Sequence, residues 1–330
     1  MNDRSFRRRD LLGWSLAASS GLAPMGAWAA AEPPPEPTRI RLSRGPVDVA
    51  CMAPMWAAEE LLRAEGFSAV EYVEYTGEID VLVSGKQDLI LYDSPGLILY
   101  LDEGQPVVVL GGIHGGCYEL FGTDRVRSVL DLRGRTVAVS STGRQAFVAA
   151  MASYVGLDPR KDIKFVLEPE AKQLFVDGKV DAVLGFPPEP QELRARKIGH
   201  VVVDTARDRP WSQYFCCMAV ANRAFARRHP VATKRALRAL VKATDLCAAD
   251  PERVTRQLVA RGYLKDYDYS LQAIREVPYR RWREYDSADT IRFFALRLHE
   301  AGVIKRNPQK LIAEGTDWRF INELKKELKS

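Results

Sequence analysis

The most unusual short stretch of the sequence is the hexapeptide His114-Gly115-Gly116-Cys117-Tyr118-Glu119. It places an imidazole, a thiol, a phenol and a carboxylate around two glycines, whose small size lets a backbone approach a ligand closely. A histidine and a cysteine at this spacing could also bind a soft metal ion such as zinc or copper(I). We favour a hinge that lines a ligand cleft, with a purely structural bend as the alternative. The candidate ligand contacts are His114, Cys117, Tyr118 and Glu119.

A second candidate is Ser141-Thr142-Gly143-Arg144, which stands between a predicted strand and a predicted helix. Free N–H groups at the start of a helix attract an oxyanion or a carboxylate. Arg144 could add a bidentate contact to such a group. Alternatively, Ser141 or Thr142 simply caps the helix. Both interpretations fit these residue types.

A third candidate is Asp93-Ser94-Pro95, which follows another predicted strand. A serine followed by proline is typical of an N-cap and the first helical position, so Ser94 has a structural alternative. Asp93 places a carboxylate at the end of a strand, and in α/β proteins strand ends face the ligand cleft. The sequence therefore predicts Asp93 and Ser94 as ligand contacts in the first half of the protein.

Three aromatic residues are further candidates. Trp211 and Tyr214 lie near the point where the chain is expected to cross back from a second α/β unit to the first. Trp56 lies near the start of the first predicted helix. Aromatic side chains beside a hinge can sandwich a planar or apolar ligand, although a single one more often packs in the core. Core packing is the alternative for each of them.

The cysteines are interpreted as structural. There are five of them, an odd number for an exported protein, against four histidines. None shows Cys-x-x-Cys spacing, and the adjacent Cys216 and Cys217 would point to opposite faces of a strand. We expect buried thiols that behave as small hydrophobes. The sequence also lacks a nucleophile elbow, a zinc-protease helix, a phosphate loop and a dinucleotide fingerprint. It therefore predicts no catalytic residue, no metal and no cofactor.

Strands and helices alternate along the chain, which predicts α/β architecture with largely parallel sheets. The expected strands are residues 39–42, 69–75, 88–92, 106–111, 136–140, 163–167, 182–185, 201–204 and 215–222. The expected helices are residues 55–64, 79–84, 94–103, 145–155, 170–176, 231–249, 251–261, 288–301 and 318–328.

Residues 1–30 are expected to be an export signal and not part of the fold. Arg8-Arg9 precedes a short apolar stretch, and Ala27-Trp28-Ala29 has the small-x-small pattern of a cleavage site. The arrangement resembles a twin-arginine signal, with an ordinary secretory signal as the alternative. Residues 31–37 read as a proline-rich tether. We therefore predict a periplasmic protein whose signal is cleaved near Ala29.

The charge pattern argues against nucleic acid as a partner. The formal net charge is only +5, with 48 basic and 43 acidic side chains. The two signs are interleaved, as on solvated helix faces, and form no basic stripe.

Six segments occur in an order that is typical of one family. They are residues 57–59, 82–88, 104–110, 131–139, 154–159 and 177–182, of which residues 131–139 read DLRGRTVAV. In these segments the chain resembles the periplasmic solute-binding proteins for nitrate, sulfonates, taurine and thiamine precursors. The eukaryotic pyrimidine-precursor synthases are distant relatives of that family. The resemblance covers roughly residues 40–245 and, more loosely, the helical tail.

The resemblance implies an α/β fold of two lobes, each a mostly parallel sheet flanked by helices, with a ligand cleft between the lobes. Residues 38–121 would begin lobe 1, residues 122–212 would form lobe 2, and residues 213–330 would return to lobe 1 and add the C-terminal helices. The resemblance also favours ligand contact over simple capping at Ser141-Thr142-Gly143-Arg144. It places a ligand-facing turn at Phe186-Pro187-Pro188-Glu189, so that Phe186 and Glu189 become candidates.

The function implied by the resemblance is solute capture. The chain would be the substrate-binding subunit of an ABC importer, a monomer that binds a small anionic or heteroaromatic solute in the periplasm. Its partners would be the permease of the inner membrane and the cytoplasmic ATPase. Two alternatives stay open. One is a metal-dependent enzyme related to the pyrimidine-precursor synthases, whose cysteine cluster only Cys216-Cys217 resembles. The other is a periplasmic sensor subunit.

Overall fold

The computed structural model describes residues 32–45, 48–74 and 79–329. The predicted export signal lies outside these residues. The described residues from Pro34 onward form one compact unit. Among the described residues, no helix is long and apolar enough to cross a membrane.

The first sheet has five strands in the order β2-β1-β3-β10-β4. They are β1 (Arg39–Ser43), β2 (Ala69–Val73), β3 (Leu89–Asp93), β4 (Val107–Gly115) and β10 (Phe215–Asn222). β1 runs parallel to β2 and β3, whereas β10 is antiparallel to both β3 and β4. Every residue of β3, β4 and β10 is buried, as is typical of strands that are covered on both faces of a sheet.

The second sheet has five strands in the order β7-β6-β8-β5-β9. They are β5 (Glu119–Gly122), β6 (Thr136–Val139), β7 (Lys164–Leu167), β8 (Ala182–Gly185) and β9 (His200–Asp204). β5 is antiparallel to β8 and β9, and β6 is parallel to β7 and β8. The predicted fold class, two mostly parallel sheets flanked by helices, is therefore confirmed.

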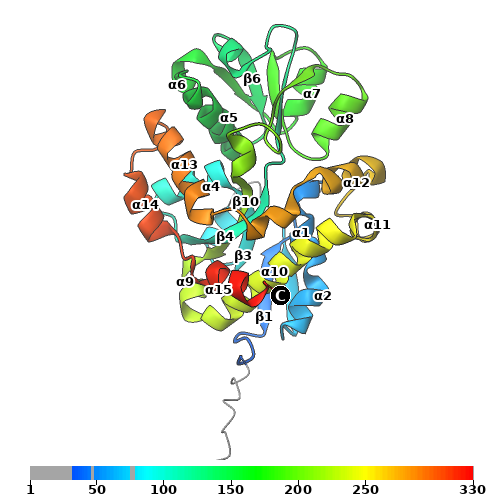
Figure 1. Cartoon of the computed structure of the whole chain (residues 1–330), viewed down its shortest axis with the longest axis vertical. Coiled ribbons are helices and arrows are strands. Elements are labelled where there is room, and N and C mark those ends of the chain that lie inside the picture. The colour runs from blue at the N-terminus through cyan, green and yellow to red at the C-terminus, as the bar shows by residue number, and fades with distance from the viewer. Residues whose placement is uncertain (1–31, 46–47, 75–78, 330) are drawn as a thin grey trace, which may run out of the picture. The chain divides into compact units, whose positions relative to one another are not determined.

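The helices of the second lobe lie between residues 129 and 213. They are η2 (Val129–Leu132), α5 (Thr142–Tyr154), α6 (Pro159–Asp162), α7 (Ala171–Val176), α8 (Glu189–Ala195) and η3 (Trp211–Gln213). The first lobe has η1 (Ala50–Met52), α1 (Ala53–Ala57), α2 (Glu59–Ala64), α3 (Asp80–Val83) and α4 (Ser94–Asp102) before the crossing. The green second lobe lies above the blue and cyan strands of the first lobe (Figure 1).

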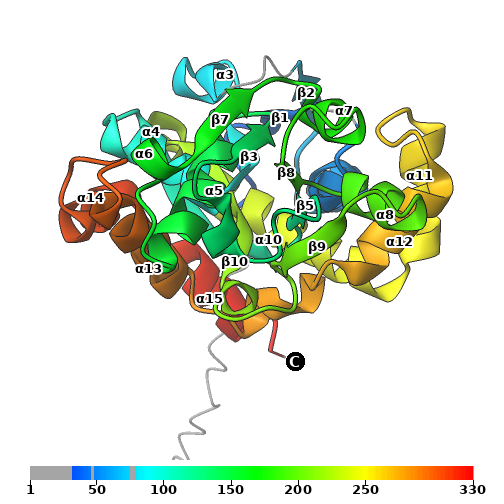
Figure 2. The ribbon, with the colours of Figure 1, turned by 90° about the horizontal axis from the view of Figure 1, so that it is seen from above.

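The C-terminal third of the chain returns to the first lobe and adds helices around it. They are α9 (Arg223–Arg228), α10 (Pro230–Ala249), α11 (Pro251–Ala260), α12 (Tyr267–Glu276), η4 (Tyr279–Arg283), α13 (Ser287–Glu300), α14 (Pro308–Gly315) and α15 (Arg319–Glu327). Seen from above, α11 and α12 flank one side of the molecule, and α13 and α14 flank the other (Figure 2). Because α13 packs against both α4 and α5, it joins the two lobes along one side.

Several elements differ from the sequence prediction, which lacks the helices α6, α8, α9 and α14. The predicted helix 55–64 is two short helices separated at Ala58. β5 begins at the last residue of the predicted hinge and was not predicted, because only Leu120 and Phe121 of its four residues are apolar. α12 is not predicted, since its buried face is made by Ser270, Ala273 and Ile274, of which only the last is strongly apolar.

The chain crosses between the sheets twice, and the two crossings are bonded together. The first connects β4 to β5 through the glycine-rich hexapeptide, and the second connects β9 to β10 through η3. The Tyr118 N–H donates to the Thr205 hydroxyl at 2.9 Å, and the Thr205 N–H donates to the Tyr118 carbonyl at 3.0 Å. The two crossings therefore act as one connection between the lobes.

Candidate functional site

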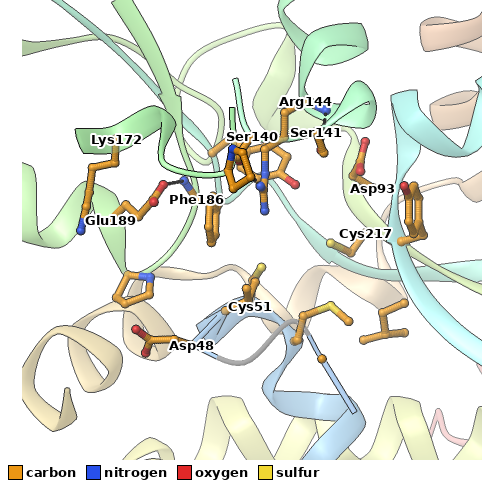
Figure 3. A pocket seen from close by; sticks show the side chains of 18 of the residues that line it. Asp48, Cys51, Asp93, Ser140, Ser141, Arg144, Lys172, Phe186, Glu189 and Cys217 are labelled. Atoms are coloured by element: carbon orange, nitrogen blue, oxygen red, sulfur yellow. Dashed lines mark hydrogen bonds between the residues drawn. The ribbon is translucent and has the colours of Figure 1, made fainter. Parts of the chain in front are cut away.

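A cavity of about 480 Å³ lies between the two lobes. In the first lobe its wall follows β1 and β3 and includes Asp48 and Asp93. In the second lobe it follows β6 and β8 and includes Arg144 and Glu189 (Figure 3). Carboxyl ends of parallel strands from both sheets thus face one space, which is the usual position of a ligand in open α/β sheets.

Arg144 is the principal cation of this cavity. It lies in the first turn of α5, where Ser141 caps the helix by accepting the Arg144 N–H at 3.3 Å. The guanidinium group donates to the Ser140 hydroxyl and stacks on Phe186, with its central carbon 3.6 Å from the ring centroid. Its Nε is buried and has no hydrogen-bond partner among the described residues. An arginine held in this way can offer a donor to a bound acidic group.

Acidic groups surround this guanidinium. Burial lowers the pKa of Arg144, but its neighbours Tyr118, Glu189 and Asp93 raise it by more, so the residue stays positively charged. Burial raises the pKa of Glu189 to about 7, against the opposing effect of Arg144. Glu189 also accepts the Phe186 N–H at 3.2 Å, which fixes the turn after β8.

The raised pKa of Glu189 predicts a dependence of stability on pH. The folded state holds this proton up to about pH 7, while the unfolded chain releases it near 4.5. The contribution of Glu189 to stability is therefore fully present at low pH and is lost as pH rises from about 4.5 to 7. Glu189→Gln should flatten this fall in melting temperature, whereas Glu60→Gln on an exposed face of α2 should leave it unchanged. Parallel melting curves at pH 5 and pH 7.5 measure the effect, and an unaltered slope in Glu189→Gln would contradict it.

Asp93 lies where α4 of the first lobe and α5 of the second lobe begin side by side. Its Oδ1 accepts the Gly96 N–H at 2.8 Å and caps α4. Its carboxylate also lies against Gly143 of α5, where an added Cβ would come within 2.6 Å of Oδ2. The carboxylate thus lies beside two helix N-termini, where negative charge is favoured.

Six of the residues proposed from the sequence line the cavity. They are Asp93, Tyr118, Ser141, Arg144, Phe186 and Glu189. Nine do not line it. They are Trp56, Ser94, His114, Cys117, Glu119, Thr142, Gly143, Trp211 and Tyr214.

The three aromatic candidates pack against other aromatic residues. This arrangement agrees with core packing, the alternative to ligand contact. Trp56 is fully buried and stacks on Tyr263 with ring centroids 4.9 Å apart. Tyr214 stacks on Phe293 at 4.1 Å, and Trp211 packs against the same ring at 5.7 Å. All three rings thus pack against other aromatic rings outside the cavity lining.

The other residues outside the cavity are held by local contacts. The Ser94 hydroxyl donates to the Phe215 carbonyl at 2.8 Å, so it ties α4 to β10. Glu119 forms an ion pair with Arg194, and Arg194 also pairs with Glu276 of α12 at 2.5 Å. Thr142 lines a separate hollow beside α4. His114 and Cys117 lie deeper in the first lobe, among the buried thiols.

Several cavity residues were missed. Asp48 and Cys51 follow β1, Lys172 lies on α7, Cys217 on β10 and Tyr269 on α12. Lys172 is paired with Glu192 at 2.5 Å. No local motif marks these positions, because only the tertiary fold brings them to the cavity. Cys51 and Cys217 also approach His114, and these three residues could hold a metal ion.

Comparisons with known proteins agree with this architecture. The family model described as NMT1/THI5 like matches residues 62–254. No protein with a curated description matches the sequence. The structure is similar to the alkanesulfonate-binding protein SsuA from Xanthomonas axonopodis pv. citri bound to MOPS, with a TM-score of 0.68 and 16% identity over 88% of this chain and 100% of that one.

Two further structures share the fold. The periplasmic nitrate-binding protein NrtA from Synechocystis PCC 6803 has a TM-score of 0.74 and 14% identity over 90% of each chain. The desulfurization enzyme DSZB has a TM-score of 0.56 and 17% identity over 88% of this chain and 99% of that one. The family model covers more than half of the sequence and confirms the resemblance found in its segments. The chain therefore belongs to the NMT1/THI5-like family and has the two-lobed fold of periplasmic binding proteins.

Proposed function

We propose that this protein is the solute-binding subunit of an ABC importer and captures a small molecule between its lobes without converting it. The observation that carries the proposal is the position of Arg144, whose guanidinium group faces a cavity walled by both lobes. A molecule bound there would contact both sheets at once. Its binding energy would therefore favour the closed arrangement, which is the form expected to dock on a permease.

The cavity also suggests the kind of solute. Arg144, Ser140 and Ser141 suit an acidic group, and Phe186 provides an aromatic surface for a planar one. The lining also contains more carboxylates than cations, with Asp48, Asp93, Glu189, Glu192 and Asp266 against Arg144 and Lys172. We infer a solute with one acidic group at Arg144 and a hydrogen-bond donor or cationic group on the opposite side. A heteroaromatic acid and a zwitterion both satisfy this description.

The cellular setting follows from the same proposal. We propose that the protein is exported to the periplasm and acts as a monomer beside an inner-membrane permease and its ATPase. The amino-terminal sequence and the fold shared with sulfonate- and nitrate-binding proteins support this setting.

A thermal-shift screen of sulfonates, heteroaromatic acids and zwitterions tests the proposal. We expect a rise in melting temperature for a compound that then binds at a 1:1 ratio in calorimetry. The compound should be recovered with its mass unchanged after prolonged incubation with the protein. Its conversion into a product would favour an enzyme instead.

A further inference from the structure

Three potential metal ligands converge in the first lobe at the wall of the cavity. They are Cys51 of η1, His114 of β4 and Cys217 of β10, and all three are buried. Their ligand atoms, two sulfurs and an imidazole nitrogen, lie within 4.8 Å of one another. His114 and Cys217 are partners on the paired strands β4 and β10, so the sheet itself fixes their proximity.

The hydrogen bonding of His114 prepares its ring for a metal. Nδ1 lies 2.7 Å from the Gly115 carbonyl oxygen. Because a carbonyl can only accept a hydrogen bond, Nδ1 carries a proton, so in the neutral ring Nε2 is the nitrogen with the free lone pair. Nε2 is buried and has no hydrogen-bond partner among the described residues. A carbonyl that fixes the tautomer in this way is typical of metal-bound histidines, and a buried nitrogen without a partner is otherwise unfavourable.

The chemical types of the three ligand atoms determine which class of metal ion the site would bind. Two thiolates and one imidazole suit thiophilic ions, whereas magnesium and calcium prefer oxygen ligands. Around a tetrahedral zinc ion, with bonds of about 2.3 Å to sulfur and 2.0–2.1 Å to nitrogen, the ligand atoms stand roughly 3.5–3.8 Å apart. A contraction of each distance between ligand atoms by at most about 1.3 Å would therefore bring the observed group to this geometry.

The group is also accessible from the cavity. Cys51 and Cys217 are part of the cavity wall as well as of the cluster, and their sulfurs are seen there in Figure 3. An ion can therefore enter without unfolding of the lobe. Three protein ligands would leave one coordination position, as in zinc sites that also bind a solute or water.

We propose that Cys51, His114 and Cys217 bind one thiophilic metal ion, Zn²⁺ or Cu⁺, through two thiolates and the imidazole Nε2. Binding would release the two thiol protons to solvent and would involve no change of oxidation state. All three ligands belong to the first lobe, whereas Arg144 belongs to the second. Arg144 is not one of the ligands, so Arg144→Ala should retain metal binding, although Cys51 and Cys217 also line the solute cavity.

Metal titration of the purified, chelator-treated and reduced protein tests this site. We expect one equivalent of Zn²⁺ or of Cu⁺ to bind in competition with a chromophoric chelator, and the preferred ion identifies the natural one. Cys51→Ser and Cys217→Ser should each weaken binding by more than about 100-fold. Cys247→Ser, which removes a buried thiol of α10 outside the cluster, should bind like the parent.

X-ray absorption of the metal-loaded parent protein provides a test that needs no variant. Sulfur scatterers at about 2.3 Å together with a nitrogen at about 2.0–2.1 Å would support the site. A shell of oxygen and nitrogen alone, failure of both ions to bind stoichiometrically, or equal affinity in Cys217→Ser and Cys247→Ser would overturn it. A Cys51–Cys217 disulfide in protein isolated from the producing cells would overturn it as well.

Discussion

Replacing Arg144 by alanine is expected to weaken solute binding by roughly tenfold to a hundredfold. The change removes a charge-assisted contact in a cavity closed from both sides, and such a contact is worth about 1.5–3 kcal/mol. The ligand-free melting temperature should stay close to that of the parent, because the Ser140 hydroxyl and the Phe186 ring that the guanidinium group contacts both line the cavity, where water can take its place. Calorimetry with a compound from the screen measures the affinity.

Two further variants make this result specific. Arg144→Lys keeps the charge but loses the planar fork, so it should bind with an affinity between those of the parent and Arg144→Ala. Arg292→Ala removes an exposed arginine from α13 and should bind like the parent. A lower melting temperature of Arg144→Ala with unchanged affinity would show that Arg144 is structural and that the site lies elsewhere.

Replacing Gly116 by alanine should be the most destabilising of the small changes considered. A Cβ at this position would lie 1.9 Å from the Thr205 carbonyl oxygen. Backbone cannot move aside as a flexible side chain can, so the two crossings between the lobes must separate. We expect the free energy of unfolding to fall by about 1–3 kcal/mol or more. The melting temperature should fall by roughly 2 to 12 °C.

Gly185→Ala is the matched control for this variant. Gly185 lies on β8, and its added Cβ would meet the nearest atom, Cγ of Pro190, at 3.4 Å, an ordinary contact distance. This variant should melt close to the parent. Equal melting temperatures for Gly116→Ala and the parent would mean that the crossings are loosely packed, which would contradict the tight connection described above.

The sequence predicted the fold well wherever one local signal determines an element. Strands such as β3 and β4 are continuous apolar runs, and α5 follows a serine N-cap, so both kinds of element can be recognised without tertiary information. The failures lie where the local signal is weak. β5 has only two apolar residues, Leu120 and Phe121, and α12 buries serine and alanine, which carry little hydrophobic signal.

The cavity residues that could be predicted also differ from the others in the strength of their local signal. Asp93, Arg144 and Glu189 follow strand ends, and the rule that such ends face the cleft predicts their position. Lys172 and Tyr269 come from the middle or start of helices, and their approach to the cavity depends on how whole lobes pack. The presence of an indole ring at position 211 does not show from the sequence whether that ring contacts a ligand or packs against Phe293.

The cluster of Cys51, His114 and Cys217 could not be predicted from the sequence either, because its residues come from distant segments. The sequence pairs His114 with Cys117, because they are neighbours in one hexapeptide. In the fold, the imidazole instead meets Cys51 and Cys217, which come from distant segments. Cys216 and Cys217 each have a thiol neighbour from another segment, and the pairing of β10 with β4 is irregular at these residues. A strand irregularity of this kind has no reliable signature in the sequence.

A crystal structure of the protein with the best compound from the screen tests the central claim most directly. The account predicts the compound between the lobes, with its acidic group bonded to Arg144 and its remainder against Phe186 and the first-lobe wall. Binding in another place, such as the hollow beside Thr142 and Arg160, would contradict the account. So would a compound that contacts only one lobe.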